Sequence, residues 1–132
     1  MYPKVLVLDS DISSEQFVCV PQKLPPEQII ETVKQMKPDI VVLRISTFAD
    51  CDVIRAIKAI EFPIKKEVAV IATFETDSNI LRQNILSAGA TRQIQMPVAP
   101  KTLRAHISKT WIDIQNARDA TAHHTAAKFA RG

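Results

Sequence analysis

The sequence predicts an α/β domain in which helices cover both faces of a doubly wound, mostly parallel sheet of five strands. Residues 40–45 are apolar except for Arg44 and show no alternation, which is typical of a strand buried on both faces. Apolar runs and amphipathic stretches alternate along the chain, as expected when helices connect parallel strands. With 132 residues, 46% of them hydrophobic, the chain is long enough for one core.

The first half of the chain supplies three of the expected strands and one helix. Residues 4–8 form an apolar run that ends at Asp9, and residues 16–20 form a shorter run closed by Pro21. Pro25 and Pro26 suit the first turn of a helix, because proline lacks an N–H that this turn leaves unpaired. That helix ends before Pro38, which leads into the strand at residues 40–45.

The second half supplies the remaining elements. A helix is expected over residues 51–61, followed by a buried strand at residues 68–73. Ser78 and Gly89 are typical first and last caps of the next helix. Its expected inward residues are Ile80, Leu81, Ile85 and Leu86. A short strand at residues 93–96 precedes the last helix, whose inward residues are Leu103, Ile107, Trp111 and Ile114.

The connection between the first two strands is unusually short, since only residues 10–15 separate them. A parallel crossover usually takes a dozen residues or more. The sequence therefore favours either an antiparallel hairpin edge or an irregular segment for residues 10–20.

Composition excludes several functional classes. The net charge of +3 comes from scattered residues, which does not favour nucleic-acid binding. Two glycines are too few for a glycine-rich phosphate loop. The two cysteines form no CxxC motif, which favours a reduced, cytoplasmic protein. No apolar run approaches the length of a membrane span, and the N-terminus lacks the shape of a signal peptide.

Residues 3–115 resemble a CheY-like response-regulator receiver domain. The resemblance is carried by the order and framing of residues 4–9, 38–45 and 68–73, and by the Gly89-Ala90 … Met96-Pro97-Val98 ending. It implies a receiver-like domain at 1–115 and a helical extension or flexible tail at 116–132. In active receivers, an aspartate at the end of the central strand accepts phosphate. Acidic residues after the first strand hold magnesium, and a hydroxyl, a lysine and an aromatic residue complete the site.

The resemblance places several of these roles on residues that cannot perform them. Arg44 stands at the phosphoacceptor position, where a guanidinium is no nucleophile. The other positions implied by the resemblance are Asp9 and Ser10 for the acidic pair, Thr73 for the hydroxyl, Met96 for the lysine and Gln93 for the aromatic residue. These departures predict a degenerate pseudo-receiver with no phosphorylation, no metal, no cofactor and no enzymatic activity. We also expect Arg44 to form a mostly buried pair with Asp9.

The chain is also about ten residues shorter than the resemblance implies between the first and central strands, and the missing material is the first helix. We expect its absence to uncover an apolar strip on the last helix, formed by Leu103, Ile107, Trp111 and Ile114. A strip of this kind needs a cover, supplied by a second copy in a homodimer or by the tail folding back. The expected function is a signalling module that acts through protein–protein interaction.

Two alternative functions remain open from the sequence. One is a receiver phosphorylated at a substitute carboxylate such as Asp50, and the other is the regulatory domain of a nucleic-acid-binding transcription factor.

Overall fold

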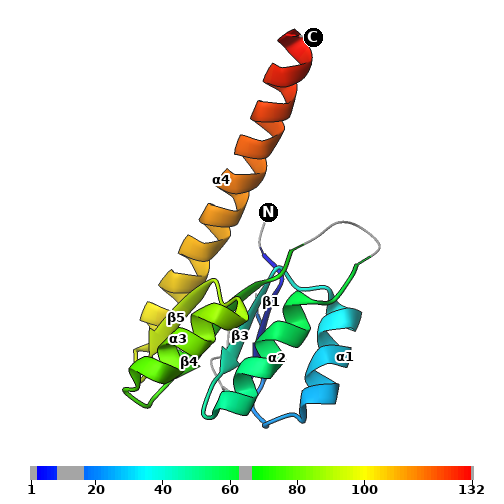
Figure 1. The fold of residues 1–132 in the computed structure, drawn as a ribbon. Helices are drawn as coiled ribbons and strands as arrows, with labels where there is room; N and C mark the ends of the chain where they lie inside the picture. Colours follow the sequence, from blue (N-terminus) through cyan, green and yellow to red (C-terminus); the bar gives the residue numbers. More distant parts are fainter. Residues whose placement is uncertain (1–2, 9–16, 63–66, 132) are drawn as a thin grey trace.

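The computed structural model describes residues 3–8, 17–62 and 67–131, with side chains up to residue 118 (Figure 1). The strands are β1 (Val5–Leu8), β2 (Phe17–Val20), β3 (Ile40–Arg44), β4 (Ala69–Phe74) and β5 (Arg92–Gln95). The helices are α1 (Pro26–Met36), α2 (Phe48–Lys58), α3 (Asn79–Ala88) and α4 (Pro100–Arg131).

The five strands form one parallel sheet in the order β2-β1-β3-β4-β5. The central strand β3 pairs Ile40 with Val5 of β1 on one side and with Ala69 of β4 on the other. This arrangement confirms the predicted doubly wound α/β fold, with β3 in the middle of the sheet.

The expectation for residues 10–20 is wrong where the structure describes them, because β2 is neither an antiparallel edge nor irregular. It pairs in parallel with β1, from Val5–Phe17 to Leu8–Val20. Residues 9–16 lie outside the described part of the chain. Eight extended residues reach about 26 Å, whereas a strand of four residues is about 13 Å long, so a short connection suffices without a helical crossover.

The sheet separates two apolar cores, because successive side chains of a strand point to opposite faces. Helices α1, α2 and α3 cover one face, and α4 covers the other (Figure 1). The first core contains Leu6, Val41 and Val70 from the central strands. The second contains Val7 and Val42 from the same region of the sheet. Three helices therefore cover one face of the sheet, and a single helix covers the other.

The last helix does not carry an exposed apolar strip, so that expectation is wrong. Leu103 and Ile107 are each 1% exposed and Trp111 is 8% exposed, and all three lie in the core between α4 and the sheet. Ile114 is partly buried against the same core. Because α4 lies directly on the sheet, the sheet itself covers these residues.

Helix α2 begins at Phe48 and ends at Lys58, three residues earlier at each end than the sequence predicts. Thr47 occupies the N-cap and Asp50 lies within the first turn. The capping interaction that starts the helix therefore lies before the predicted first residue.

Helix α3 confirms its predicted caps and corrects its predicted inward face. The Ser78 hydroxyl accepts a hydrogen bond from the Leu81 N–H at 3.2 Å, and Gly89 adopts φ +108°, the left-handed conformation that favours glycine. Leu81 and Ile85 are buried as expected, together with Ala88. Ile80 and Leu86 are 65% and 54% exposed, because they lie on either side of the stripe formed by residues 81, 85 and 88.

Candidate functional site at the carboxyl edge of the sheet

Arg44 is the last residue of β3 and lies opposite Thr73 of β4 at the carboxyl edge of the sheet. Its Nη2 donates a hydrogen bond at 2.9 Å to the carboxylate of Glu75, the residue that follows β4. The side chains of Arg44 and Glu75 are 41% and 63% exposed, so this ion pair lies at the surface. Arg44 is therefore more exposed than predicted. Its predicted partner Asp9, like Ser10, lies outside the described residues, and that pair stays a prediction.

The loop after Arg44 is already bound by an internal carboxylate. Asp50 Oδ2 accepts hydrogen bonds from the backbone N–H groups of Ser46 at 2.7 Å and Thr47 at 3.0 Å. A carboxylate in the first turn also interacts favourably with the positive end of the helix dipole. Asp50 thus starts helix α2 and occupies the Ser46 and Thr47 backbone donors in the loop that follows β3.

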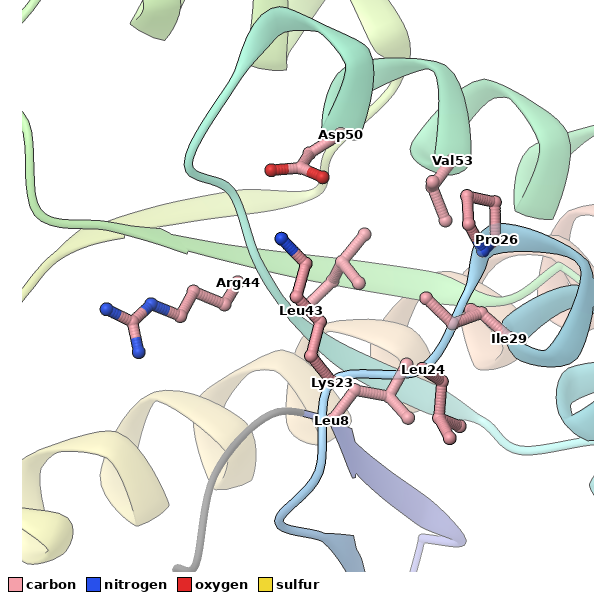
Figure 2. Close-up of a pocket in the computed structure, with 9 residues that line it drawn as sticks. All are labelled: Leu8, Lys23, Leu24, Pro26, Ile29, Leu43, Arg44, Asp50 and Val53. Atoms are coloured by element: carbon pink, nitrogen blue, oxygen red, sulfur yellow. The ribbon is translucent and has the colours of Figure 1, made fainter.

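A small pocket lies beside this loop, between β3 and the first turns of α1 and α2 (Figure 2). Its volume is about 50 Å³, and it is lined by Leu8, Lys23, Leu24, Pro26, Ile29, Leu43, Arg44, Asp50 and Val53. Figure 2 shows the Arg44 guanidinium directed away from the apolar lining and the Lys23 ammonium directed toward Asp50. Ligand sites for organic molecules usually measure about 300–1,000 Å³, so this pocket is too small for one.

Of the other residues implied by the resemblance, Thr73 lies beside Arg44 in the sheet, whereas Met96 does not point to this site. Thr73 is 6% exposed, and its hydroxyl makes no hydrogen bond to any residue that the structure describes. Met96 is partly buried against the core beneath α4, together with Val98. The position expected for a phosphate-binding lysine is therefore occupied by a thioether that packs into the interior.

Gln93 lies on β5, and its Oε1 atom is buried with no hydrogen-bond partner among the residues that the structure describes. On α3, Arg82 Nη2 donates to Asp77 at 3.0 Å and to Gln95 Oε1 at 2.7 Å, and the guanidinium lies 5.3 Å from the centre of the Phe74 ring. The Nε of Arg82 is also buried and has no partner within the described part of the chain.

Sequence reasoning missed Arg82. A single charged residue on an amphipathic helix gives no signal that distinguishes a bridging side chain from a solvated one.

Cys51 is buried in α2, and its side chain is 1% exposed. Burial raises the pKa of this thiol, the nearby Arg55 lowers it, and Asp50 and Asp52 raise it further. The thiol is therefore protonated near neutral pH, which does not favour a reactive cysteine. In the part of the chain that the structure describes, no helix combines the length and apolar character needed to cross a membrane.

No known protein family and no curated protein matches the chain in sequence. Solved structures of receivers match its fold. A response regulator from Burkholderia multivorans is 14% identical, with 83% of this chain and 95% of that chain covered and a TM-score of 0.61. A response regulator from Thermotoga maritima is 21% identical, with 83% and 97% covered and a TM-score of 0.61.

A longer protein matches over part of its length. NtrX from Brucella abortus is 15% identical, with 92% of this chain covered and a TM-score of 0.69, but this chain spans only 29% of that protein. Together these likenesses establish a receiver fold of the flavodoxin-like type. At such low identities they establish the fold alone.

Proposed function

We propose that the chain is a receiver-like signalling module that acts without phosphorylation, through protein–protein interaction as a homodimer. The observation that carries the proposal is Arg44 at the end of β3, where the resemblance places the phosphate-accepting carboxylate. A guanidinium stays protonated in proteins and has no lone pair suited to attack phosphorus. The fold is kept while its central chemical group is replaced.

Neighbouring positions support the loss of phosphate chemistry. Phosphoryl transfer to a carboxylate needs cations that offset the crowded negative charge. Met96 packs against the core beneath α4 in place of a lysine. Ser10, at the second acidic position, is a poor ligand for magnesium, which prefers carboxylates and water.

Asp50 is a poor substitute acceptor, which argues against the first alternative function. Its carboxylate already accepts two backbone hydrogen bonds that start α2. Attaching a phosphoryl group would withdraw charge from that carboxylate and disturb both bonds. The pairing of Glu75 with Arg44 likewise engages a second carboxylate near the strand end.

The role in signalling draws support from the chains that share the fold. A response regulator with a GGDEF domain is 17% identical, and the present chain spans 50% of it, with a TM-score of 0.65. Receiver folds therefore occur there as units of larger signalling proteins. Helix α4 extends well beyond the sheet, which gives this chain a surface for a partner (Figure 1).

The direct test is incubation with acetyl phosphate and magnesium, followed by intact mass spectrometry. We expect no phosphoryl group on the wild-type chain or on the Arg44→Asp variant, because Ser10 and Met96 remain. The triple variant Ser10→Asp, Arg44→Asp, Met96→Lys supplies the missing groups and should take up phosphate to some extent. Near-stoichiometric phosphorylation of the wild-type chain would refute the proposal.

A further inference from the structure

A groove of about 1170 Å³ opens at the amino-terminal edge of the sheet, where α4 leaves it. One wall is formed by α4 between Thr110 and Arg118, and the opposite wall by the end of α2 and the residues after it. The partly buried Ile60 and Phe62 extend from the core beneath α2, and Ile114 extends from the core beneath α4. Both cores therefore reach the surface in this groove.

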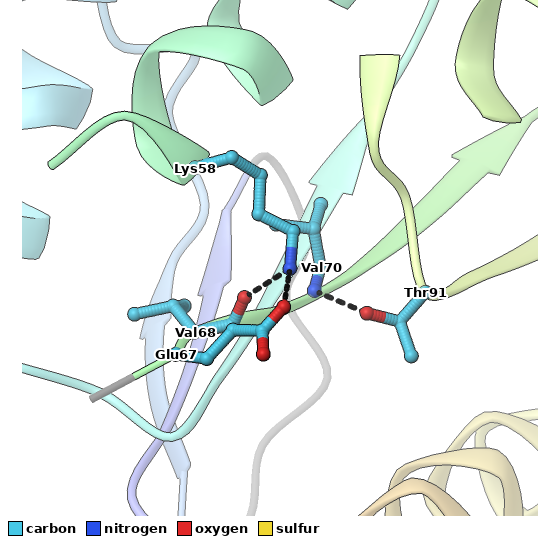
Figure 3. A network of polar contacts seen from close by, with 5 residues as sticks. All are labelled: Lys58, Glu67, Val68, Val70 and Thr91. Carbon is cyan, nitrogen blue, oxygen red and sulfur yellow. Dashed lines mark hydrogen bonds and ion pairs between the residues drawn. The ribbon is translucent and has the colours of Figure 1, made fainter. Parts of the chain in front are cut away.

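Ion pairs surround the apolar floor. Lys58 donates to Glu67 at 3.3 Å and to the Val68 carbonyl at 2.8 Å, as Figure 3 shows. On the α4 side, Asp113 accepts from Arg92 at 2.7 Å. Among the described residues that line the groove, each charged side chain has an oppositely charged partner, including Arg118, which pairs with Asp39 at 3.8 Å. An apolar centre with a polar rim is typical of protein interfaces.

Helix α4 continues to Arg131 and projects beyond the rest of the molecule (Figure 1). Among the described apolar residues of the helix, Ile114 is the last that packs against the core. The remaining 17 residues correspond to about 25 Å of helix. Most of the stability of a helix in a protein comes from packing of one of its faces, so a second helix would stabilise this extension.

The sequence positions in line with the buried face of α4 recur along this extension. Helical spacing places positions 118, 122, 125 and 129 in line with Trp111, at i+7, i+11, i+14 and i+18. Six of the 15 residues from 117 to 131 are alanine, which permits close approach of a second helix. Phe129 is the one large apolar residue after Ile114.

We propose that the occupant of the groove is the α4 extension of a second copy of this chain, lying antiparallel, with Phe129 of each copy seated in the groove of the other. This proposal rests on the homodimer in the proposed function and specifies its interface. Placing Phe129 opposite Ile114 puts the two-fold axis midway between them in sequence, between Thr121 and Ala122.

The antiparallel direction follows from the position of the groove at the base of the same helix. A partner helix that runs antiparallel brings its end back to that base, whereas a parallel partner carries its end away from it. A two-fold pair also fills both grooves at once and pairs the two extensions.

Cysteine cross-linking tests the register. In a Cys19→Ser background, Ala122→Cys places two thiols beside the axis, and we expect rapid formation of a disulfide-linked dimer under mild oxidation. Thr125→Cys is the matched control on the same helix face. In the antiparallel register, the residue-125 thiols of the two chains are displaced by about 10 Å along the helix axes. This distance is too great for a disulfide.

Substitution of Phe129 tests the anchor. We expect Phe129→Ala to raise the dimer dissociation constant at least tenfold in light scattering and to reduce the Ala122→Cys cross-link. Ile112→Ala is the control, because Ile112 is 53% exposed on α4 but does not line the groove, and it should leave dimerisation unchanged.

Three outcomes would overturn this interface: cross-linking at 125 as efficient as at 122, a dimer that is insensitive to Phe129→Ala, or a chain that stays monomeric at high micromolar concentration. None of these alters the phosphorylation test. Conversely, phosphate uptake would refute the proposed function and leave the cross-linking result intact.

Discussion

At the scale of single residues, Arg44 shows what a sequence can and cannot predict about a site. Its place at the end of β3 follows from the apolar run that precedes it. Its contact with Glu75 does not, because that contact depends on the path of the chain after β4. Asp50 is a second example. An acidic residue is typical of the first turn of a helix, but only the structure shows which backbone donors Asp50 binds.

The exposure of Arg44 sets the expected stability of its variants. Surface ion pairs contribute about 0–1 kcal/mol, whereas breaking a buried pair costs about 3–5 kcal/mol. We therefore expect Arg44→Ala to lower the free energy of unfolding by less than about 1 kcal/mol. Urea denaturation of Arg44→Ala, Glu75→Ala and the double variant measures the coupling free energy between the two side chains. A loss of 3 kcal/mol or more would indicate a buried partner such as Asp9.

Gln93 and Gln95 provide a matched pair of substitutions on β5. Gln93→Leu removes a buried acceptor that has no partner among the described residues, so we expect the free energy of unfolding to stay equal or rise by about 1 kcal/mol. Gln95→Leu removes an acceptor that Arg82 uses, so we expect a loss of about 1 kcal/mol. Thermal and urea unfolding compare them. Equal losses in both variants would mean that Gln93 has a partner in solution.

The raised pKa of Cys51 makes stability depend on pH in the alkaline range. Below the ordinary thiol pKa of 9.0, both folded and unfolded chains keep the proton, so Cys51 has no effect on the pH dependence. Above it, the unfolded chain loses the proton more readily, so stability should fall as pH rises toward the folded pKa. Urea unfolding between pH 8 and 10 measures this slope. In Cys51→Ala, the free energy of unfolding should fall less steeply with pH than in the wild-type chain. The same slope in both chains would mean that burial does not perturb the pKa of the thiol.

At the scale of elements, apolar runs and caps located most of the helices and strands. Ser78 and Gly89 bound α3 as predicted, since local chemistry determines helix ends. The inward face of α3 was partly wrong, because the neighbours of the helix decide which flanking apolar residues are covered. The direction of β2 could not be derived from the length of its connection, since that rule assumes a helical crossover.

The start of α2 depends on Asp50. Asp50→Ala removes the acceptor for the Ser46 and Thr47 N–H groups, so we expect the free energy of unfolding to fall by about 1–2 kcal/mol. Asp50→Asn keeps one carbonyl oxygen and should lose less. Urea unfolding and hydrogen exchange at the Ser46 and Thr47 amides measure both effects. Unchanged protection of these amides in Asp50→Ala would show that another group caps the helix.

At the scale of the whole molecule, the parallel sheet with helices on both faces follows from the alternation of apolar runs and amphipathic segments. That alternation does not predict which helices, or which partner, cover each face of the sheet. The stripe on α4 is apolar whether a partner or the sheet covers it, and in the structure the sheet covers Leu103, Ile107 and Trp111. The homodimer that we propose therefore uses the part of α4 that extends past the sheet.

Dimerisation measured with and without a phosphoryl donor tests the central claim most directly. Multi-angle light scattering would follow the dimer fraction across concentration in three buffers, with magnesium alone, with magnesium and acetyl phosphate, and with magnesium and acetate as the control. A phosphorylation-independent module predicts a concentration-dependent dimer with the same dissociation constant in all three. A dimer fraction that changes only with acetyl phosphate would contradict that claim and identify a working receiver.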